Sequence, residues 1–177
     1  MIIQRKGFLG LTLKCCGYVL SIDSGEGYSL YTRTPPLGGE SEEEGEYGPF
    51  RWSSFEVPGP RGSIRAYLVE AKGIKVLHTG GLTRRIDLPE ADVLAVPAGG
   101  LWYLDAREAC KLFKEGKWRA LVPLALWEPG IKAHFDTVNT IREVCRGLRR
   151  VRPGRSWKVT FDPVKGTLVL LSAGPLL

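Results

Sequence analysis

The residues that could carry out acid–base chemistry are few in this 177-residue sequence. It contains two histidines, His78 and His134, and their candidate carboxylate partners are Asp23, Asp105 and Asp136. A catalytic base must come within about 3 Å of the proton it removes. No spacing along the chain brings two of these five residues together, so a hydrolase built from them is an alternative, not the favoured hypothesis.

The four cysteines do not have the spacing of a metal site. Cys15 and Cys16 are adjacent, while Cys110 and Cys145 stand alone, and zinc knuckles need closely spaced pairs. Small buried packing residues are the favoured interpretation. A nucleophilic Cys15 or Cys16 would lack a predictable histidine partner. A Cys110–Cys145 disulfide stays open, because intracellular disulfides occur in proteins from hot environments.

A basic segment, residues 146–158, is the strongest positive feature of the sequence. It contains no acid, and its candidate nucleic-acid-binding residues are Arg146, Arg149, Arg150, Arg152, Arg155, Trp157 and Lys158. Guanidinium groups pair with phosphates and an exposed indole stacks on bases, which indicates nucleic-acid binding. The alternative is structural, because cations at the end of a helix complement its dipole and thermophile surfaces are rich in arginine.

Composition favours one domain spanning residues 1–177 and located in the cytoplasm. No stretch approaches the roughly 20 apolar residues needed to cross a membrane, so no membrane partner is expected. The net charge of +6 is uneven, at −1 over residues 1–100 and +7 over residues 101–177. A single Gln and a single Asn among many charged residues are typical of thermophile proteins.

The elements that must position these residues are mostly strands. Alternating apolar residues predict a hairpin over 8–23 that turns near Gly17, and continuous apolar runs predict buried strands at 92–97 and 119–126. Further strands are expected at 63–71, 74–78, 157–161 and 167–172, the last two as a hairpin, with helices at 105–116 and 136–148. The acidic segment 33–49 is expected to be a solvated loop. The order predicts an α/β protein.

Two of the predicted strands end in paired glycines. "KVLHTGGL" places Gly80 and Gly81 after His78, and "AVPAGGLWYLD" places Gly99 and Gly100 before the first helix. Together with "LSIDSG" and "VPLALW", this succession resembles the metallo-β-lactamase superfamily, in particular its small ascorbate-phosphate-lactonase-like hydrolases. The resemblance covers residues 1–130 and is strongest over residues 67–130.

The resemblance implies a fold but not its metal chemistry. The expected fold class is an α/β αββα sandwich of metallo-β-lactamase type, reduced in size, with mixed, largely antiparallel sheets. The family's bridging carboxylate corresponds to Gly81 and a metal-binding histidine to Ala125, while no histidine lies between Asp23 and Ser63. His78 corresponds to a residue that is usually structural in the family. The sequence therefore predicts a degenerate member with no metal and no cofactor.

Large aromatic residues follow these strand ends. Trp102, Tyr103 and Trp127 are expected either to cap the emptied site or to form a partner surface, with core packing as the alternative. The whole remnant-site or partner-surface set is His78, Gly80, Gly99, Gly100, Trp102, Tyr103 and Trp127. We therefore expect a non-enzymatic interaction module or accessory subunit that binds a protein partner or a second copy. Nucleic-acid binding and a hydrolase with a relocated active site are the alternatives.

Overall fold

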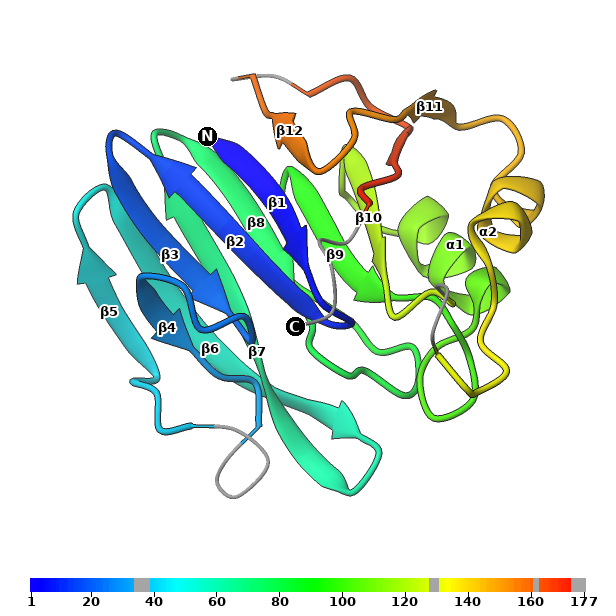
Figure 1. Ribbon diagram of the computed structural model, residues 1–177, viewed down its shortest axis with the longest axis horizontal. Coiled ribbons are helices and arrows are strands. Elements are labelled where there is room, and N and C mark those ends of the chain that lie inside the picture. The colour runs from blue at the N-terminus through cyan, green and yellow to red at the C-terminus, as the bar shows by residue number, and fades with distance from the viewer. Residues whose placement is uncertain (34–38, 128–130, 161–162, 173–177) are drawn as a thin grey trace.

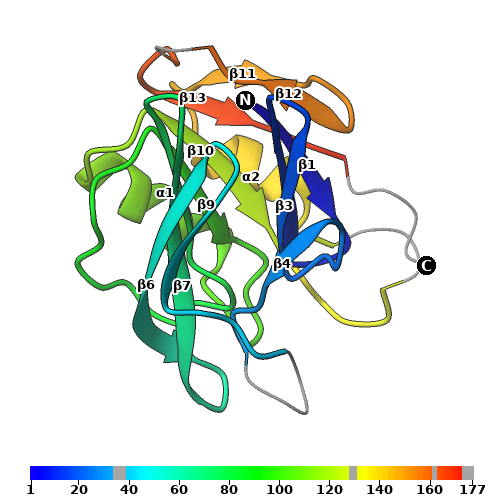
Figure 2. The ribbon, with the colours of Figure 1, turned by 90° about the vertical axis from the view of Figure 1, so that its left-hand side faces the viewer.

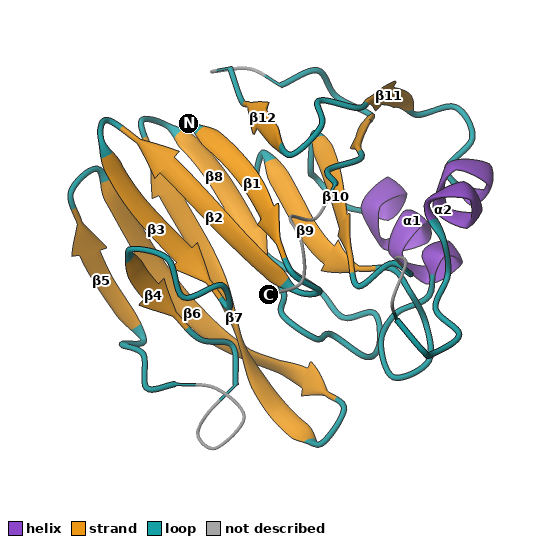
Figure 3. Ribbon diagram, in the orientation of Figure 1, coloured by secondary structure: helices purple, strands orange, loops and turns teal. Residues whose placement is uncertain are grey.

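The computed structural model describes residues 1–33, 39–127, 131–160 and 163–172, which form two facing β-sheets (Figures 1 and 3). In this part of the chain the first sheet has the order β12-β1-β2-β3-β4. Its strands are β1 (Ile2–Lys6), β2 (Gly10–Cys15), β3 (Tyr18–Ile22), β4 (Tyr28–Leu30) and β12 (Ser156–Lys158). The first three form an antiparallel meander, which confirms the hairpin predicted near Gly17.

The second sheet has the order β11-β13-β10-β9-β8-β7-β6-β5 over the described residues. Its strands are β5 (Glu44–Tyr47), β6 (Phe50–Gly59), β7 (Gly62–Ala71), β8 (Ile74–His78), β9 (Val93–Pro97), β10 (Ala120–Leu124), β11 (Arg149–Val151) and β13 (Thr167–Val169). β5 to β8 pair antiparallel, and β8, β9, β10, β13 and β11 pair parallel. The predicted mixed sheets are confirmed.

The two faces of the second sheet bury different cores. On β9, Val93 and Ala95 point into the core between the sheets, whereas Leu94 and Val96 pack under α1 (Ala106–Glu115) and α2 (Val138–Val144). This is why residues 93–97 and 120–126 are apolar without alternation. The predicted strands 92–97 and 119–126 each start one residue too early, at Asp92 and Arg119. Within the described residues both helices lie on the outer side of the second sheet, so the sandwich is reduced to two sheets and one helical layer (Figure 1).

The C-terminal strands do not form the predicted hairpin. β12 pairs with β1 in the first sheet, whereas β13 pairs with β10 and β11 in the second (Figure 2). β13 is buried throughout, whereas β12 contributes the partly buried Trp157 to the core between the sheets. Residues 161 and 162 of the expected hairpin lie outside the described residues. The second helix is also shorter than the predicted 136–148, since it begins after its N-cap, Thr137, and ends at Val144, before its C-cap, Cys145.

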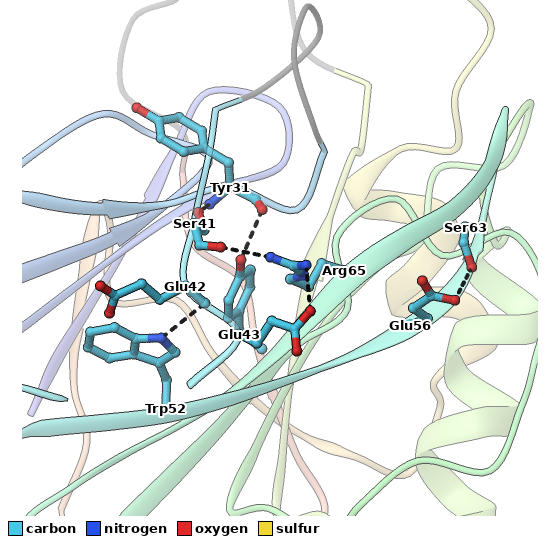
Figure 4. Close-up of polar contacts among 9 residues, drawn as sticks. Tyr31, Ser41, Glu42, Glu43, Trp52, Glu56, Ser63 and Arg65 are labelled. Carbon is cyan, nitrogen blue, oxygen red and sulfur yellow. Dashed lines mark hydrogen bonds and ion pairs between the residues drawn. The ribbon is translucent and has the colours of Figure 1, made fainter. Parts of the chain in front are cut away.

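The acidic segment is only partly the solvated loop that its composition predicts. Glu44–Tyr47 form β5, where glutamates face solvent and Tyr47 stacks on Tyr28 with ring centroids 5.0 Å apart. Arg65 donates hydrogen bonds to the Ser41 carbonyl (2.8 Å) and to Glu43 (3.2 Å), as Figure 4 shows. In "EGEY" exposed glutamates alternate with partly buried residues, a pattern that is typical of a strand. The sequence analysis considered only the high glutamate content of this segment. Residues 34–38 of the expected loop lie outside the described residues.

The alternative left open for the cysteines is confirmed, because Cys110 and Cys145 form a disulfide. The bridge joins α1 to the C-cap of α2, across 35 residues of sequence. Cys15 is buried, as expected of a packing residue, and Cys16 is exposed.

Candidate active site

The loops after three parallel strands form one edge of the second sheet. β8, β9 and β10 run parallel, so residues 79–82, 98–104 and 125–127 all follow their carboxyl ends. Backbone hydrogen bonds join these loops, from Ala98 N to Leu124 O (2.9 Å) and from Leu104 N to Leu82 O (3.0 Å). Ligands of α/β proteins bind at such an edge, which makes it the first place to search for a site.

Gly81, which corresponds to the family's bridging carboxylate, lies against the Tyr103 ring. A Cβ atom there would lie 2.8 Å from Cε1 of Tyr103. At Gly80 a Cβ atom would lie 2.8 Å from Cβ of Thr32. Tyr103 and Thr32 therefore fill the space in which ligands after β8 would project.

Ala125, which corresponds to a metal-binding histidine, is fully buried, and its amide donates to the Phe8 carbonyl (2.9 Å). The Phe8 ring packs against Phe135 at 4.8 Å and Tyr103 at 6.1 Å between centroids. Trp102 reaches Phe135 at 6.3 Å but is 61% exposed. Aromatic side chains thus cover this edge, with Tyr103 packed inward and Trp102 facing solvent. Trp127 lies apart and donates to the Ile131 carbonyl (3.1 Å).

His78 joins the two sheets and has no free ring nitrogen. Its Nδ1 accepts from the Gly80 amide (3.1 Å), so Nε2 carries the proton and donates to the Leu9 carbonyl at 2.8 Å. The ring is completely buried, and this desolvation lowers its pKa below the ordinary value of 6.5, against the opposing effect of Asp23. The structural interpretation of this histidine is the one that its contacts support.

The other candidate acids and bases are separated or already engaged. Asp23 accepts hydrogen bonds from the Thr32 amide (2.9 Å) and hydroxyl (2.5 Å). Asp105 caps α1 by accepting from Glu108 N at 2.7 Å, as predicted, and Asp136 accepts from Ala106 N at 2.9 Å. Asp105 and Asp136 therefore both accept hydrogen bonds from amides in the first turn of α1, where the helix dipole stabilises negative charge. His134 is exposed.

The residues present do not fit a dinuclear metal centre. Such a centre needs several imidazoles and carboxylates that converge. Gly81 and Ala125 offer no ligand atom, and both His78 nitrogens are engaged. Over the ranges that the structure describes, no three His, Cys, Asp or Glu side chains gather as a metal site would require.

A side chain added at Gly99 would contact fixed backbone, whereas one added at Gly81 would contact a side chain that can move. We expect Gly99→Ala to lower the free energy of unfolding by about 3 kcal/mol and Gly81→Ala by about 1 kcal/mol, within the range measured for overpacking. A Cβ at Gly99 would contact the fixed Ala125 carbonyl, whereas at Gly81 it would contact a Tyr103 ring that can turn. Urea unfolding measures both variants. In a Tyr103→Leu variant, Gly81→Ala should no longer lower the free energy of unfolding, whereas Gly99→Ala should lower it as before. If Gly81→Ala cost the same with and without Tyr103, contact with this ring would not be the cause.

A hollow of about 480 Å³ opens beside Gly81. Its wall includes Gly81, Trp102 and Tyr103 from the strand-end loops, Arg61 and Ser63 from the β6–β7 hairpin, and Arg33. Burial raises the pKa of the Tyr103 phenol above its ordinary value, against the opposing effect of the nearby Arg33 guanidinium. We call this the Gly81 hollow. Its volume suits a small molecule.

Ser63, which lines the Gly81 hollow, forms a hydroxyl–carboxylate pair with Glu56, which lies outside that lining. Sequence reasoning missed this pair. Ser63 Oγ donates to Glu56 Oε2 at 3.0 Å (Figure 4). The antiparallel register sets Ser63 opposite Pro58, two residues beyond Glu56. Because Glu56 and Ser63 meet only through this pairing, the one available signal was the β6 strand, which the sequence analysis did not predict.

The basic segment is not one surface element. Exposed Arg149 and Arg150 lie on β11 at the edge of the second sheet, whereas Trp157 and Lys158 lie on β12 at the edge of the first (Figure 2). Trp157 is partly buried against the core between the sheets, and Arg146 is 3.4 Å from Glu143. Exposed Arg152 and Arg155 lie between the two strands. These contacts favour packing for Trp157, and nucleic-acid binding stays a prediction.

Comparison with solved structures identifies the fold. A proposed zinc-dependent hydrolase of the metallo-β-lactamase superfamily from Thermotoga maritima is 17% identical, with a TM-score of 0.81 over 98% of this chain and 99% of that one. The metallo-β-lactamase fold protein YhfI from Bacillus subtilis is 11% identical, with a TM-score of 0.66 over 98% and 97%. An isothiocyanate hydrolase from Delia radicum gut bacteria is 8% identical, with a TM-score of 0.66 over 99% and 97%.

The chain therefore has the metallo-β-lactamase fold, as the sequence resemblance predicted. No family model and no curated protein matches the sequence. The prediction that the chain is not an enzyme is wrong in the light of these structures, because proteins that share its fold along almost its whole length are described as hydrolases. No helix in the described ranges is long and apolar enough to cross a membrane.

Proposed function

We propose that the chain is a hydrolase whose active site is the Gly81 hollow and not a dinuclear metal centre. The observation that carries the proposal is the Ser63–Glu56 pair, whose 3.0 Å hydrogen bond is within the range of activated nucleophiles. Ser63 lines a hollow whose wall also includes Arg33 and Arg61. The hydrolases among the similar structures support the same class of reaction.

The Ser63–Glu56 pair differs from the other hydroxyl–carboxylate pair near this edge. Asp23 and Thr32 are also within hydrogen-bond distance, but Thr32 is only 2% exposed. Ser63 and Glu56 are both exposed, so a substrate can reach them. Of these two pairs, only Ser63–Glu56 is therefore suited to covalent chemistry on a bound ligand.

The proposed reaction is acyl transfer from an ester to water. Ser63 Oγ attacks the acyl carbon while Glu56 takes its proton, and the ester C–O bond breaks as Glu56 returns that proton to the leaving alcohol. Water then attacks the acyl-serine, again losing a proton to Glu56, which passes it to Ser63 Oγ as the acid leaves. Arg33 and Arg61 stabilise the negative charge that forms on the carbonyl oxygen.

We expect Ser63→Ala to lower kcat/KM for p-nitrophenyl ester hydrolysis at least 100-fold, in keeping with loss of a nucleophile or base. Glu56→Gln should have a similar effect, because the amide cannot accept the proton. Initial rates measured by nitrophenolate release, with and without a chelator, provide the test.

The matched control for this experiment is Ser53→Ala, since Ser53 is an exposed serine on β6. Its rate should equal that of the unmodified protein. Undiminished turnover in Ser63→Ala, or turnover that disappears with chelator, would overturn the proposal.

A further inference from the structure

We infer that the Gly81 hollow binds an aromatic oxyanion, that is, an aryl group carrying a phosphate or carboxylate. The binding inference uses the same hollow as the proposed function and names the class of ligand that it takes. It rests on two arginines that form no ion pair with a described residue, on two aromatic side chains, and on the size of the space between them.

Arg33 and Arg61 supply an uncompensated positive charge. Among the described residues, the residues lining the hollow include no Asp or Glu, and neither arginine forms an ion pair there. Two nearby acids are engaged, since Asp23 accepts two hydrogen bonds from Thr32 and Glu56 accepts one from Ser63. An anion entering the hollow would therefore meet two cations without displacing a protein carboxylate.

Arg33 also carries a buried donor without an acceptor. Its Nε is inaccessible to solvent and has no hydrogen-bond partner in the described part of the chain. A buried donor without an acceptor has lost its hydrogen bond to water, and this penalty is larger when the group is charged. An oxyanion bound by the guanidinium in a two-point contact would satisfy this donor.

The Arg33 backbone is held in place by its neighbour. Thr32 donates its amide and hydroxyl to Asp23, and its carbonyl accepts from Arg65 N at 2.8 Å. This anchors the start of the Arg33 side chain at the hollow before any ligand arrives. Such preorganisation reduces the entropy lost on binding.

The aromatic preference comes from Tyr103 and Trp102. The Tyr103 ring lies against Gly81, and Trp102 is 61% exposed at the same wall. Two aromatic side chains beside two guanidinium groups suit a ligand with a flat apolar part and a charged head. The volume of about 480 Å³ accommodates a single substituted ring.

Titration of the full chain with phenyl phosphate, benzoate and benzyl alcohol, followed by calorimetry and tryptophan fluorescence, tests the inference. We expect at least one anion to bind 10-fold more tightly than the neutral alcohol, and the tighter anion identifies the head group. Arg33→Met and Arg61→Met should each weaken that binding at least 10-fold. Arg51→Met is the matched control, because Arg51 is an exposed β6 arginine paired with Glu46, and it should bind normally.

Equal binding of the alcohol and the anions, or unchanged binding in both arginine variants, would overturn the inference. Arg61 lies at an exposed turn, so its variant tests binding even if the Arg33 variant fails to fold. Anion binding without esterase activity would support the inference and contradict the proposed function. Turnover of neutral esters without anion binding would support the proposed function and contradict the inference.

Discussion

Reduction of the Cys110–Cys145 disulfide is expected to lower the free energy of unfolding by about 3–4 kcal/mol, from the loop-closure entropy of a bridge spanning 35 residues. The bridge has particular importance for α2, a seven-residue helix in which Ile141 is the buried residue. Helices this short are marginal by themselves. Loss of the bridge should therefore first release α2 from α1.

Urea unfolding with and without dithiothreitol measures this effect, and hydrogen exchange over residues 138–144 shows where it begins. Cys16→Ser is the control, because Cys16 is an exposed free thiol and its loss should leave the midpoint unchanged. Identical midpoints for the oxidised and reduced protein would show that the disulfide contributes no stability.

Replacing His78 with leucine is expected to cost about 3 kcal/mol or more. The change would leave the Leu9 carbonyl and the Gly80 amide without their partner, and each buried unsatisfied group costs about 1–3 kcal/mol. His78→Gln should cost less, because its side-chain amide can still donate to the Leu9 carbonyl. Thermal unfolding of the two variants provides the comparison, and equal costs would contradict the role assigned to this hydrogen bond.

His78 should also make stability depend on pH. Because burial lowers its pKa in the folded protein, the unfolded chain binds the proton more readily. Its contribution is complete above pH 6.5, the unfolded value, and is lost as pH falls toward the folded pKa. The slope in that window approaches about 1.4 kcal/mol per pH unit. His78→Gln should lack this slope, and an unchanged pH profile in the variant would contradict the assignment.

Several elements were predictable because they follow from local patterns. Residues 74–78 were assigned as a strand with the bounds of β8, and Asp105 was assigned as the cap of α1. Continuous apolar runs identified β9 and β10 because strands covered on both faces have no polar side. The first sheet was incompletely predicted and β6 was not predicted, since strands gain much of their stability from pairing with other strands.

The candidate site was less predictable than the fold. The missing ligands at Gly81 and Ala125 showed that the residues do not fit a dinuclear metal centre. The prediction that the chain is not an enzyme went further than these two positions allow, because an active site can also be formed by other residues. Ser63 and Glu56 are ordinary in the sequence and meet only through the β6–β7 register.

The sequence by itself determined the strands from β7 to β10, the metallo-β-lactamase resemblance and the absence of metal-ligating residues at Gly81 and Ala125. Local periodicity and residue identity are sufficient for these. Tertiary structure alone decided that β12 and β13 enter different sheets, that Tyr103 fills the space at Gly81, and that Arg33 and Arg61 share one hollow. These depend on packing between distant segments, whose free energy no short stretch of sequence contains.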